Sequence, residues 1–180
     1  MFKINKRKKY VLFLLLFICS FIPIGDLFLI GYIKVITGDL SITTIILLIF
    51  GLYIMLHNKK ELYEKYNITT FMIIICVIGV IFYPTTLGLT YFDPYILGYQ
   101  NFYMTLFLFF MAIVMVIKNL NLIALSIILA IFAHSCHILN SPNLWDYCID
   151  FPLFLYSIGF LFAKLINNHT YKTWALLKQG

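Results

Sequence analysis

Charged side chains are scarce in this sequence. Asp, Glu, Lys and Arg together make up 11% of the 180 residues, whereas a soluble domain carries about 25%. Hydrophobic residues make up 63%, and the mean hydropathy is +0.97. This composition excludes an ordinary soluble domain. It predicts an integral membrane protein with a single domain over residues 1–180.

Several sequence motifs are also missing. There is no Gly-x-Ser-x-Gly, no P-loop and no dinucleotide fingerprint, so the common hydrolase, nucleotidase and dehydrogenase templates do not apply. No basic stripe alternates with aromatic residues, which argues against nucleic-acid binding despite the formal charge of +6. The positive charges are better interpreted as anchors beside anionic lipid headgroups. Enzyme activity is not indicated by any of these features.

The amino-terminal region lacks a cleavage site. Basic residues precede an apolar run, as in a secretory signal, but the run is followed by Ser20–Asp26 without small residues in an Ala-x-Ala pattern. We therefore expect the first apolar segment to be retained as a membrane span.

Six apolar stretches follow one another along the chain. A membrane-spanning helix needs about 20 mostly apolar residues, within a range of about 17–25. The candidate spans are residues 10–30, 41–56, 68–83, 101–117, 122–139 and 151–167. They predict an all-α polytopic helical bundle with about six transmembrane helices. Four longer spans, with other stretches lying flat or re-entering the membrane, are an open alternative.

The basic residues indicate the orientation of this bundle. Twelve of the 13 Lys and Arg residues precede the first stretch, follow the last, or lie in the second or fourth connection, counting Lys164 at the end of the sixth stretch. Only Lys34 lies in a connection of the opposite parity. Cytoplasmic loops are enriched in Lys and Arg, so both termini are predicted to be cytoplasmic. The predicted location is a bacterial inner membrane.

One cluster of polar residues offers chemistry. His134 and His137 are spaced to share a helix face, and so are Asp146 and Asp150. Imidazole and carboxylate groups bind zinc and similar divalent metals, and ionisable groups within a span often relay protons. These four residues are candidates for a metal or proton-relay site. The alternative is that the histidines bond to nearby backbone groups.

Two cysteines flank the same region. Cys136 and Cys148 would both lie at the outer face, which is oxidising in a bacterial periplasm. A disulfide between them is possible if the geometry allows it.

The long connection at residues 83–100 is rich in aromatic residues and has one charge, Asp93. It is expected to fold back onto the bundle, because an apolar loop does not extend into water. It could cover a lipid, quinone or peptide site, or belong to the ordinary interfacial aromatic belt. The candidate partner-binding or lipid-binding residues are Tyr91, Phe92, Asp93, Tyr95, Tyr99 and Trp145.

Two functions are compatible with these features. The first is a small membrane protein acting through membrane or periplasmic partners or through self-association, as an accessory subunit of a complex or as an immunity or sensing protein. Its outward surface would be aromatic and acidic. The second is a membrane enzyme or transporter that uses the His134, His137, Asp146 and Asp150 cluster, with a divalent metal as a possible cofactor.

Overall fold

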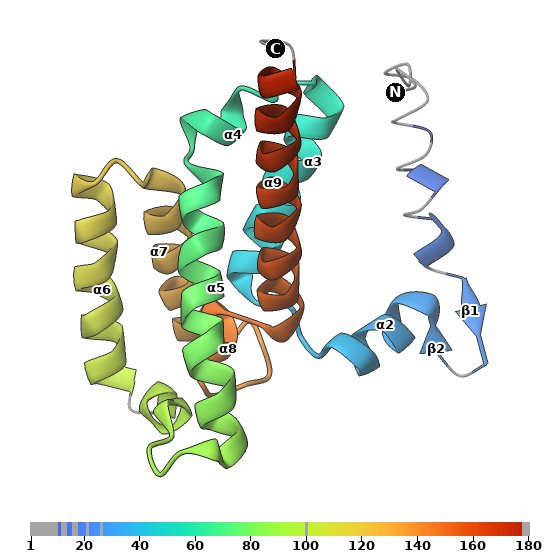
Figure 1. Ribbon diagram of the computed structural model, residues 1–180. Coiled ribbons are helices and arrows are strands. Elements are labelled where there is room, and N and C mark those ends of the chain that lie inside the picture. Colours follow the sequence, from blue (N-terminus) through green and yellow to red (C-terminus); the bar gives the residue numbers. More distant parts are fainter. Residues whose placement is uncertain are drawn as a thin grey trace.

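The structure is a computed structural model, which describes residues 27–99 and 101–177 and, before them, residues 11, 14–15, 18–20 and 22–25. For residues 24, 27, 30, 33, 36–37, 101 and 167–177 the description covers the backbone alone. The regular structure of the described residues is helical apart from one pair of two-residue strands (Figure 1). The predicted all-α helical bundle is therefore confirmed for the residues described.

The helices of the bundle run alternately in opposite directions (Figure 1). The principal α-helices are α3 (Ile42–His57), α5 (Ile68–Pro84), α6 (Asn101–Ile117), α7 (Asn121–Ser135) and α9 (Phe151–Leu177). The shorter elements are α2 (Leu29–Thr37), α4 (Leu62–Lys65), α8 (Trp145–Cys148), the π-helix η1 (Thr85–Leu89) and the 3₁₀-helix η2 (Pro94–Tyr99).

The predicted first span at residues 10–30 is wrong as a single helix. Strand β1 (Pro23–Ile24) pairs antiparallel with β2 (Leu27–Phe28), and α2 begins directly after β2. Pro23 lacks a backbone N–H, and Gly25 has a φ of 61° at the turn, a conformation that glycine adopts without a steric cost. The chain reverses there instead of continuing as a helix.

The other predicted boundaries agree closely except at two places. Helices α3, α5 and α6 follow the predicted ranges. Helix α7 stops at Ser135, four residues before the predicted end at residue 139, whereas α9 continues ten residues beyond residue 167. Among the described residues, Ile68–Leu89 is long and apolar enough to span a membrane, and four apolar helices are shorter. Six spans are thus not confirmed.

Asparagines with left-handed backbone lie in the turns between helices at one end of the bundle. Asn58, Asn67 and Asn119 all have positive φ, between 50° and 58°. Asparagine tolerates the left-handed conformation better than most residues, so it can stop a helix where the chain must turn back. These turns carry Lys59, Lys60, Lys65 and Lys118 in or beside them, and we refer to this end as the lysine end.

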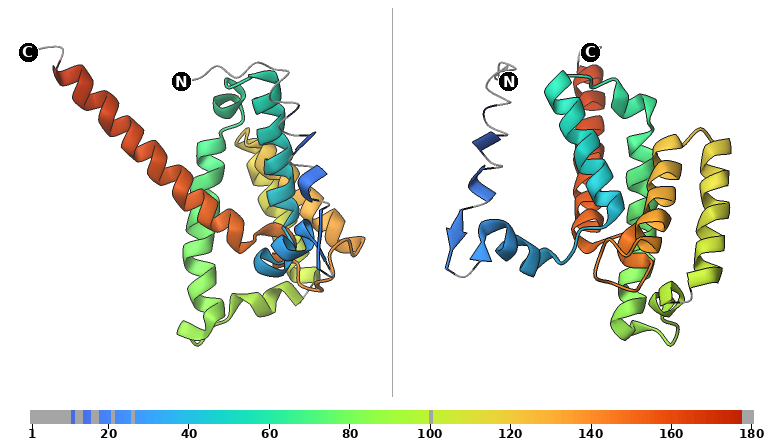
Figure 2. Two further views of the ribbon diagram at one scale, coloured as in Figure 1. Left: turned by 90° about the vertical axis from the view of Figure 1, so that its right-hand side faces the viewer. Right: turned by 180° about the vertical axis from the view of Figure 1, so that it is seen from behind.

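The helices pack in two groups around a shared interior. Helix α6 lies beside α7, α5 packs against α9, and α3 packs against α7. One core cluster includes Phe71 and Met72 of α5 with Leu153 of α9, and the second includes Met104 of α6 and Tyr147 of α8. Figure 2 shows α9 leaning away from the other helices towards its C-terminal end.

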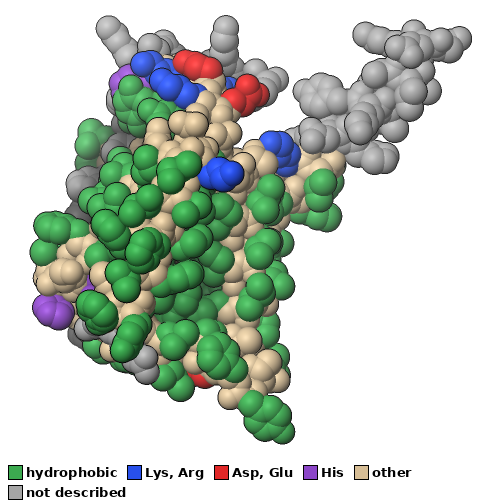
Figure 3. Space-filling view, turned by 90° about the vertical axis from the view of Figure 1, so that its left-hand side faces the viewer, with side chains coloured by type: hydrophobic (Ala, Val, Ile, Leu, Met, Phe, Trp, Pro, Cys, Tyr) green, Lys and Arg blue, Asp and Glu red, His purple; other side chains and the backbone are tan. Residues whose placement is uncertain are grey.

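The flank of the bundle is apolar. Large side chains such as Phe102, Phe107 and Phe110 of α6 are more than half exposed. In Figure 3 hydrophobic side chains cover the visible flank, while most Lys, Arg, Asp and Glu side chains gather at one end. An exposed apolar surface of this extent marks an interaction with a membrane or another protein.

Candidate binding site

Two connections cover the end opposite the lysine end, which we call the loop end. They are residues 85–99, between α5 and α6, and residues 136–150, between α7 and α9. Asn143 joins them. It is fully buried and its Nδ2 donates to the carbonyl of Tyr95 at 2.9 Å. Beside this bond, the backbone N–H of Leu144 donates to the carbonyl of Gly98 at 3.1 Å. Satisfied buried hydrogen bonds of this kind fix one arrangement of the two loops.

Gly98 is required by this contact. A Cβ atom at residue 98 would lie 1.8 Å from Asn143 Oδ1. That oxygen is itself held in place, because it accepts from the backbone N–H of Trp145 at 2.9 Å. A side chain at residue 98 would therefore separate the loops. Glycine is present here for close backbone approach.

The start of η2 is also fixed by side chains. Asp93 Oδ1 accepts from the backbone N–H of Tyr95 at 2.9 Å, an Asx turn at the Asp93-Pro94 step. The indole Nε1 of Trp145 donates to the carbonyl of Pro94 at 3.0 Å. The connection at 83–100 thus folds back on the bundle as predicted, and it does so by binding the α7–α9 loop.

Asp146 accepts two side-chain hydrogen bonds on one oxygen. Oδ2 accepts from the hydroxyl of Tyr95 at 2.9 Å and from the hydroxyl of Ser141. Burial, followed by the hydrogen bond to the negative Asp146, raises the pKa of the Tyr95 hydroxyl above its ordinary value. Tyr95 therefore remains a proton donor, and none of the described Lys or Arg side chains forms an ion pair with Asp146.

Asp150 connects the beginnings of two helices. Its Oδ1 accepts from the backbone N–H of Leu153 at 2.7 Å, and its Oδ2 accepts from the backbone N–H of Ser41 at 2.7 Å. Ser41 is the N-cap of α3, and its hydroxyl oxygen accepts from the N–H of Thr44. The carboxylate is only 8% exposed. A negative charge at two helix N-termini satisfies backbone N–H groups that lack an intrahelical partner, and it is attracted to the positive ends of both helix dipoles.

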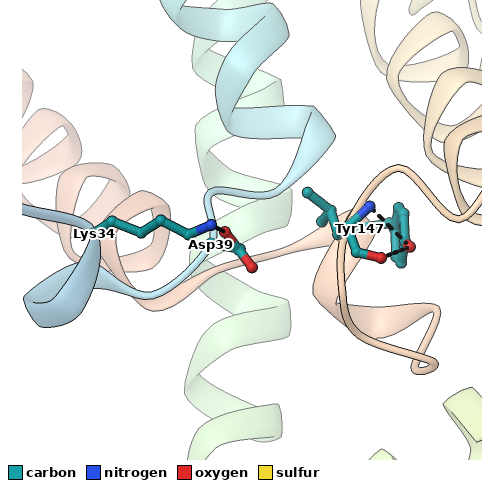
Figure 4. A network of polar contacts seen from close by, with 4 residues as sticks. Lys34, Asp39 and Tyr147 are labelled. Atoms are coloured by element: carbon teal, nitrogen blue, oxygen red, sulfur yellow. Dashed lines mark hydrogen bonds and ion pairs between the residues drawn. The ribbon is translucent and has the colours of Figure 1, made fainter. Parts of the chain in front are cut away.

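A pocket of about 500 Å³ opens between these groups. Its lining includes the carboxylates of Asp39, Asp146 and Asp150 and the rings of Tyr83 and Tyr95, but no Lys, Arg or His. Within the described residues, the one ion pair joins Lys34 Nζ to Asp39 Oδ1 at 2.6 Å (Figure 4). Asp146 and Asp150 are bonded to neutral donors only, so the pocket has a negative potential that favours a cation.

The predicted histidine pair does not belong to this pocket. His134 lies in the last turn of α7 and is buried, and its Nε2 donates to the carbonyl of Pro142 at 3.1 Å. His137 comes after the end of α7 with a φ of 51° and is exposed. The two ring centroids are 6.3 Å apart. The expectation of a shared helix face is wrong because α7 ends at Ser135.

The expectation that Asp146 and Asp150 share a helix face is also wrong. Helix α8 ends at Cys148, and Ile149 has extended backbone with φ −146° and ψ 142°. Both carboxylates nevertheless line the same pocket. Asp146 belongs to α8, and Asp150 directly precedes α9. Over the described part of the chain, no group of three or more His, Cys, Asp or Glu residues is placed to hold a metal ion.

Cys136 and Cys148 are free thiols in this structure. Cys136 is exposed after the end of α7, whereas Cys148 packs against the core cluster around Tyr147. Burial, with a smaller contribution from the charge of Asp146, raises the pKa of the Cys148 thiol to about 12. The disulfide is therefore absent because one thiol faces solvent and the other faces the interior.

This difference predicts selective labelling. In detergent-solubilised protein with Cys19 and Cys76 replaced by serine, a maleimide at pH 8 should modify Cys136 and leave Cys148 unmodified, because thiolates are the reactive form. Mass spectrometry gives the number of adducts, and Cys136→Ser should abolish labelling. Labelling that requires prior reduction would show that the disulfide forms.

The raised pKa of Cys148 also makes stability depend on pH. An unfolded cysteine has a pKa of about 8.5. The stability from burying the neutral thiol is therefore present below that pH and is lost as pH rises towards 12.

The predicted aromatic residues separate into two sets. Tyr91 is fully exposed and Phe92 is 62% exposed. Tyr95 and Trp145 point into the contact between the loops, as their hydrogen bonds show. Tyr99 lies edge-to-face against Tyr95 with centroids 5.6 Å apart. Tyr91 and Phe92 are thus available to a partner, whereas Tyr95 and Trp145 hold the site together.

Sequence reasoning missed the residues that organise the loops. Besides Asn143, these include Tyr147, which is fully buried and whose hydroxyl donates to the carbonyl of Leu139 at 2.9 Å and accepts from its N–H at 3.2 Å (Figure 4). The Ser141-Pro142-Asn143 turn was the available signal, because Ser and Asn bond to nearby backbone in turns. Comparisons with protein-family models, curated proteins and solved structures found no match to this chain.

Proposed function

We propose that this chain is a multi-pass α-helical protein of a bacterial cytoplasmic membrane, with both termini in the cytoplasm, which acts through a partner protein. The partner binds at the loop end, on the extracytoplasmic side, and inserts a Lys or Arg side chain into the carboxylate pocket. In this role the chain is an accessory subunit of a membrane complex or an immunity or sensing protein.

The distribution of side chains supports the membrane location. The flanks are apolar and exposed, Lys59, Lys60, Lys65 and Lys118 lie at one end, and Lys34 is at the other side of the bundle with Asp39. Helices of 15–17 residues are about 23–26 Å long. They are shorter than a hydrocarbon core of about 30 Å, and local thinning of the bilayer compensates for the difference.

The observation that carries the proposed partner is the pocket itself. Three carboxylates line it, and among the described residues only Asp39 has a cation paired with it. The side chains of Lys34 and Asp39 are 60% and 34% exposed, and an ion pair with that exposure contributes at most about 1 kcal/mol. A partner's cation can therefore displace Lys34 at little cost. Tyr91 and Phe92, exposed in the same connection as the pocket-lining Tyr95, supply apolar area for the partner.

No observation favours the metal or proton-relay alternative in the same way. His134 and His137 are placed away from the two carboxylates of the pocket lining, and His134 is bonded to backbone. The proposal therefore concerns binding rather than catalysis.

Cross-linking in intact cells tests the proposed function. A photoreactive benzoylphenylalanine at residue 91 should form an adduct of defined mass with one partner protein, whereas the same group at residue 48 on the flank of α3 should not. Asp39→Asn should lower the adduct yield about two- to fivefold, because it removes one of the negative charges of the pocket. Lys34→Gln should raise the yield about two- to fivefold, because it leaves the charge of Asp39 unpaired.

The two substitutions form a matched pair, because both break the same ion pair and any loss of fold would lower both yields. Opposite changes identify a partner held by its positive charge. Equal yields in both variants, or no adduct from residue 91, would contradict the proposal.

A further inference from the structure

A second, apolar groove of about 410 Å³ runs along the flank of the bundle between α3 and α9. Ile68 and Met72 of α5 form its floor, and Tyr63 of α4 lines it near the lysine end. The two walls are not packed together, because α3 packs mainly on α7 and α9 mainly on α5. The leaning of α9 in Figure 2 separates the walls further towards the lysine end.

Gly51 keeps the middle of the groove open. It lies in the α3 wall, and a Cβ atom added there would meet no atom within 4 Å. Glycine in a helix interior costs about 1 kcal/mol relative to alanine, so a glycine that touches nothing is not explained by packing within this chain. It leaves space for an occupant.

Lysines lie in the segments next to the end of the groove near Tyr63. Lys59, Lys60 and Lys65 lie in the α3–α5 connection that contains Tyr63, and Lys164 Nζ of α9 donates to Thr69 Oγ1 of α5. Glu61 and Glu64 are the acidic residues of the same connection, so these segments carry four lysines and two glutamates. The opposite end of the groove begins at Leu40 and Pro152, next to Asp150. The groove therefore has a positive end and a negative end, with an apolar wall between them.

We propose that this groove binds an anionic phospholipid, with one acyl chain between α3 and α9 and its phosphate among Lys59, Lys60 and Lys164. An acyl chain matches the apolar lining, and an anionic headgroup matches the lysines, which attract the anionic cytoplasmic leaflet. Only this orientation places the phosphate away from Asp150. The inference rests on the membrane location in the proposed function but not on its partner protein.

Native mass spectrometry of the full chain in neutral detergent tests the lipid site. Phosphatidylglycerol should be retained better than phosphatidylcholine with the same acyl chains. Gly51→Leu fills the groove and should reduce retained phosphatidylglycerol by at least about tenfold. Gly159→Leu is the matched control, since residue 159 of α9 also has nothing within 4 Å but does not line the groove; it should retain the lipid.

Charge variants test the position of the headgroup. Lys60→Gln with Lys164→Gln should lower phosphatidylglycerol retention to that of phosphatidylcholine. Lys118→Gln, a lysine at the same end on the α6–α7 side, should leave it unchanged. Equal retention by the wild type and Gly51→Leu, equal retention of the two lipids, or a lipid-free dimer that Gly51→Leu dissociates would overturn the proposal. A failure here with adducts still formed from residue 91 would leave the proposed partner intact.

Discussion

Asp150→Ala is expected to lower the free energy of unfolding by about 3 kcal/mol. The substitution removes the acceptor for the N–H groups of Ser41 and Leu153, and the carboxylate that it removes is only 8% exposed. A buried donor left without a partner costs about 1–3 kcal/mol, and loss of an N-cap side chain costs about 1 kcal/mol. Denaturant titration in detergent micelles measures the change.

Two variants separate this effect from a general loss of charge. Asp150→Asn retains an oxygen that can accept one of the two bonds, so it should lose only about 1–2 kcal/mol. Asp93→Ala removes the same atoms from a half-buried loop position that accepts a single bond from Tyr95, and should cost at most about 1 kcal/mol.

Amide exchange gives a local readout of the same substitution. In Asp150→Ala the N–H groups of Ser41 and Leu153 should exchange faster than in the wild type, because the two helix beginnings lose their shared acceptor and open more often. Equal losses for Asp150→Ala and Asp93→Ala, or unchanged exchange at the two amides, would show that Asp150 does not join the two helices.

The double role of Asp150 shows why the site could be predicted only in part. The length of the apolar stretches predicted spans at residues 41–56, 68–83 and 101–117, within one residue of α3, α5 and α6, because apolar length depends on local sequence alone. The same pattern led to the wrong first span, because Pro23 and Gly25 interrupt an otherwise apolar run. The sequence also identified Asp146 and Asp150 as important, but as metal ligands on one helix face.

Their actual role depends on contacts distant in the sequence. Asp150 bonds to Ser41, 109 residues away, and Asp146 bonds to Tyr95, 51 residues away. No spacing rule relates such residues, because the pairing is created by the alternation of helix directions. His134 illustrates the opposite case. The alternative in which it bonds to nearby backbone was available from the sequence, and its partner Pro142 is only eight residues away.

Gly79→Ala is expected to destabilise the protein by about 2 kcal/mol, although alanine is the better helix former. Gly79 is buried in α5 where α9 packs against it, and a Cβ atom there would lie 2.1 Å from Cδ2 and 2.7 Å from Cγ of Phe154. The ring cannot move freely, because it packs against Tyr83 with centroids 5.1 Å apart and against Phe151. Overpacking of this kind costs about 1–3 kcal/mol, and small residues permit such close helix approach in membranes.

The sign of the effect distinguishes this packing role from helix propensity. Gly51→Ala and Gly159→Ala make the same change on α3 and α9, where the new methyl group meets no atom within 4 Å. Both should leave stability unchanged or raise it by up to about 1 kcal/mol. Unfolding of all three variants in the same micelles provides the comparison.

Phe154→Ala combined with Gly79→Ala should recover part of the loss relative to Phe154→Ala alone, because the cavity left by the ring accepts the methyl group. If Gly79→Ala were as stable as the two controls, the close contact between α5 and α9 at this residue would be wrong.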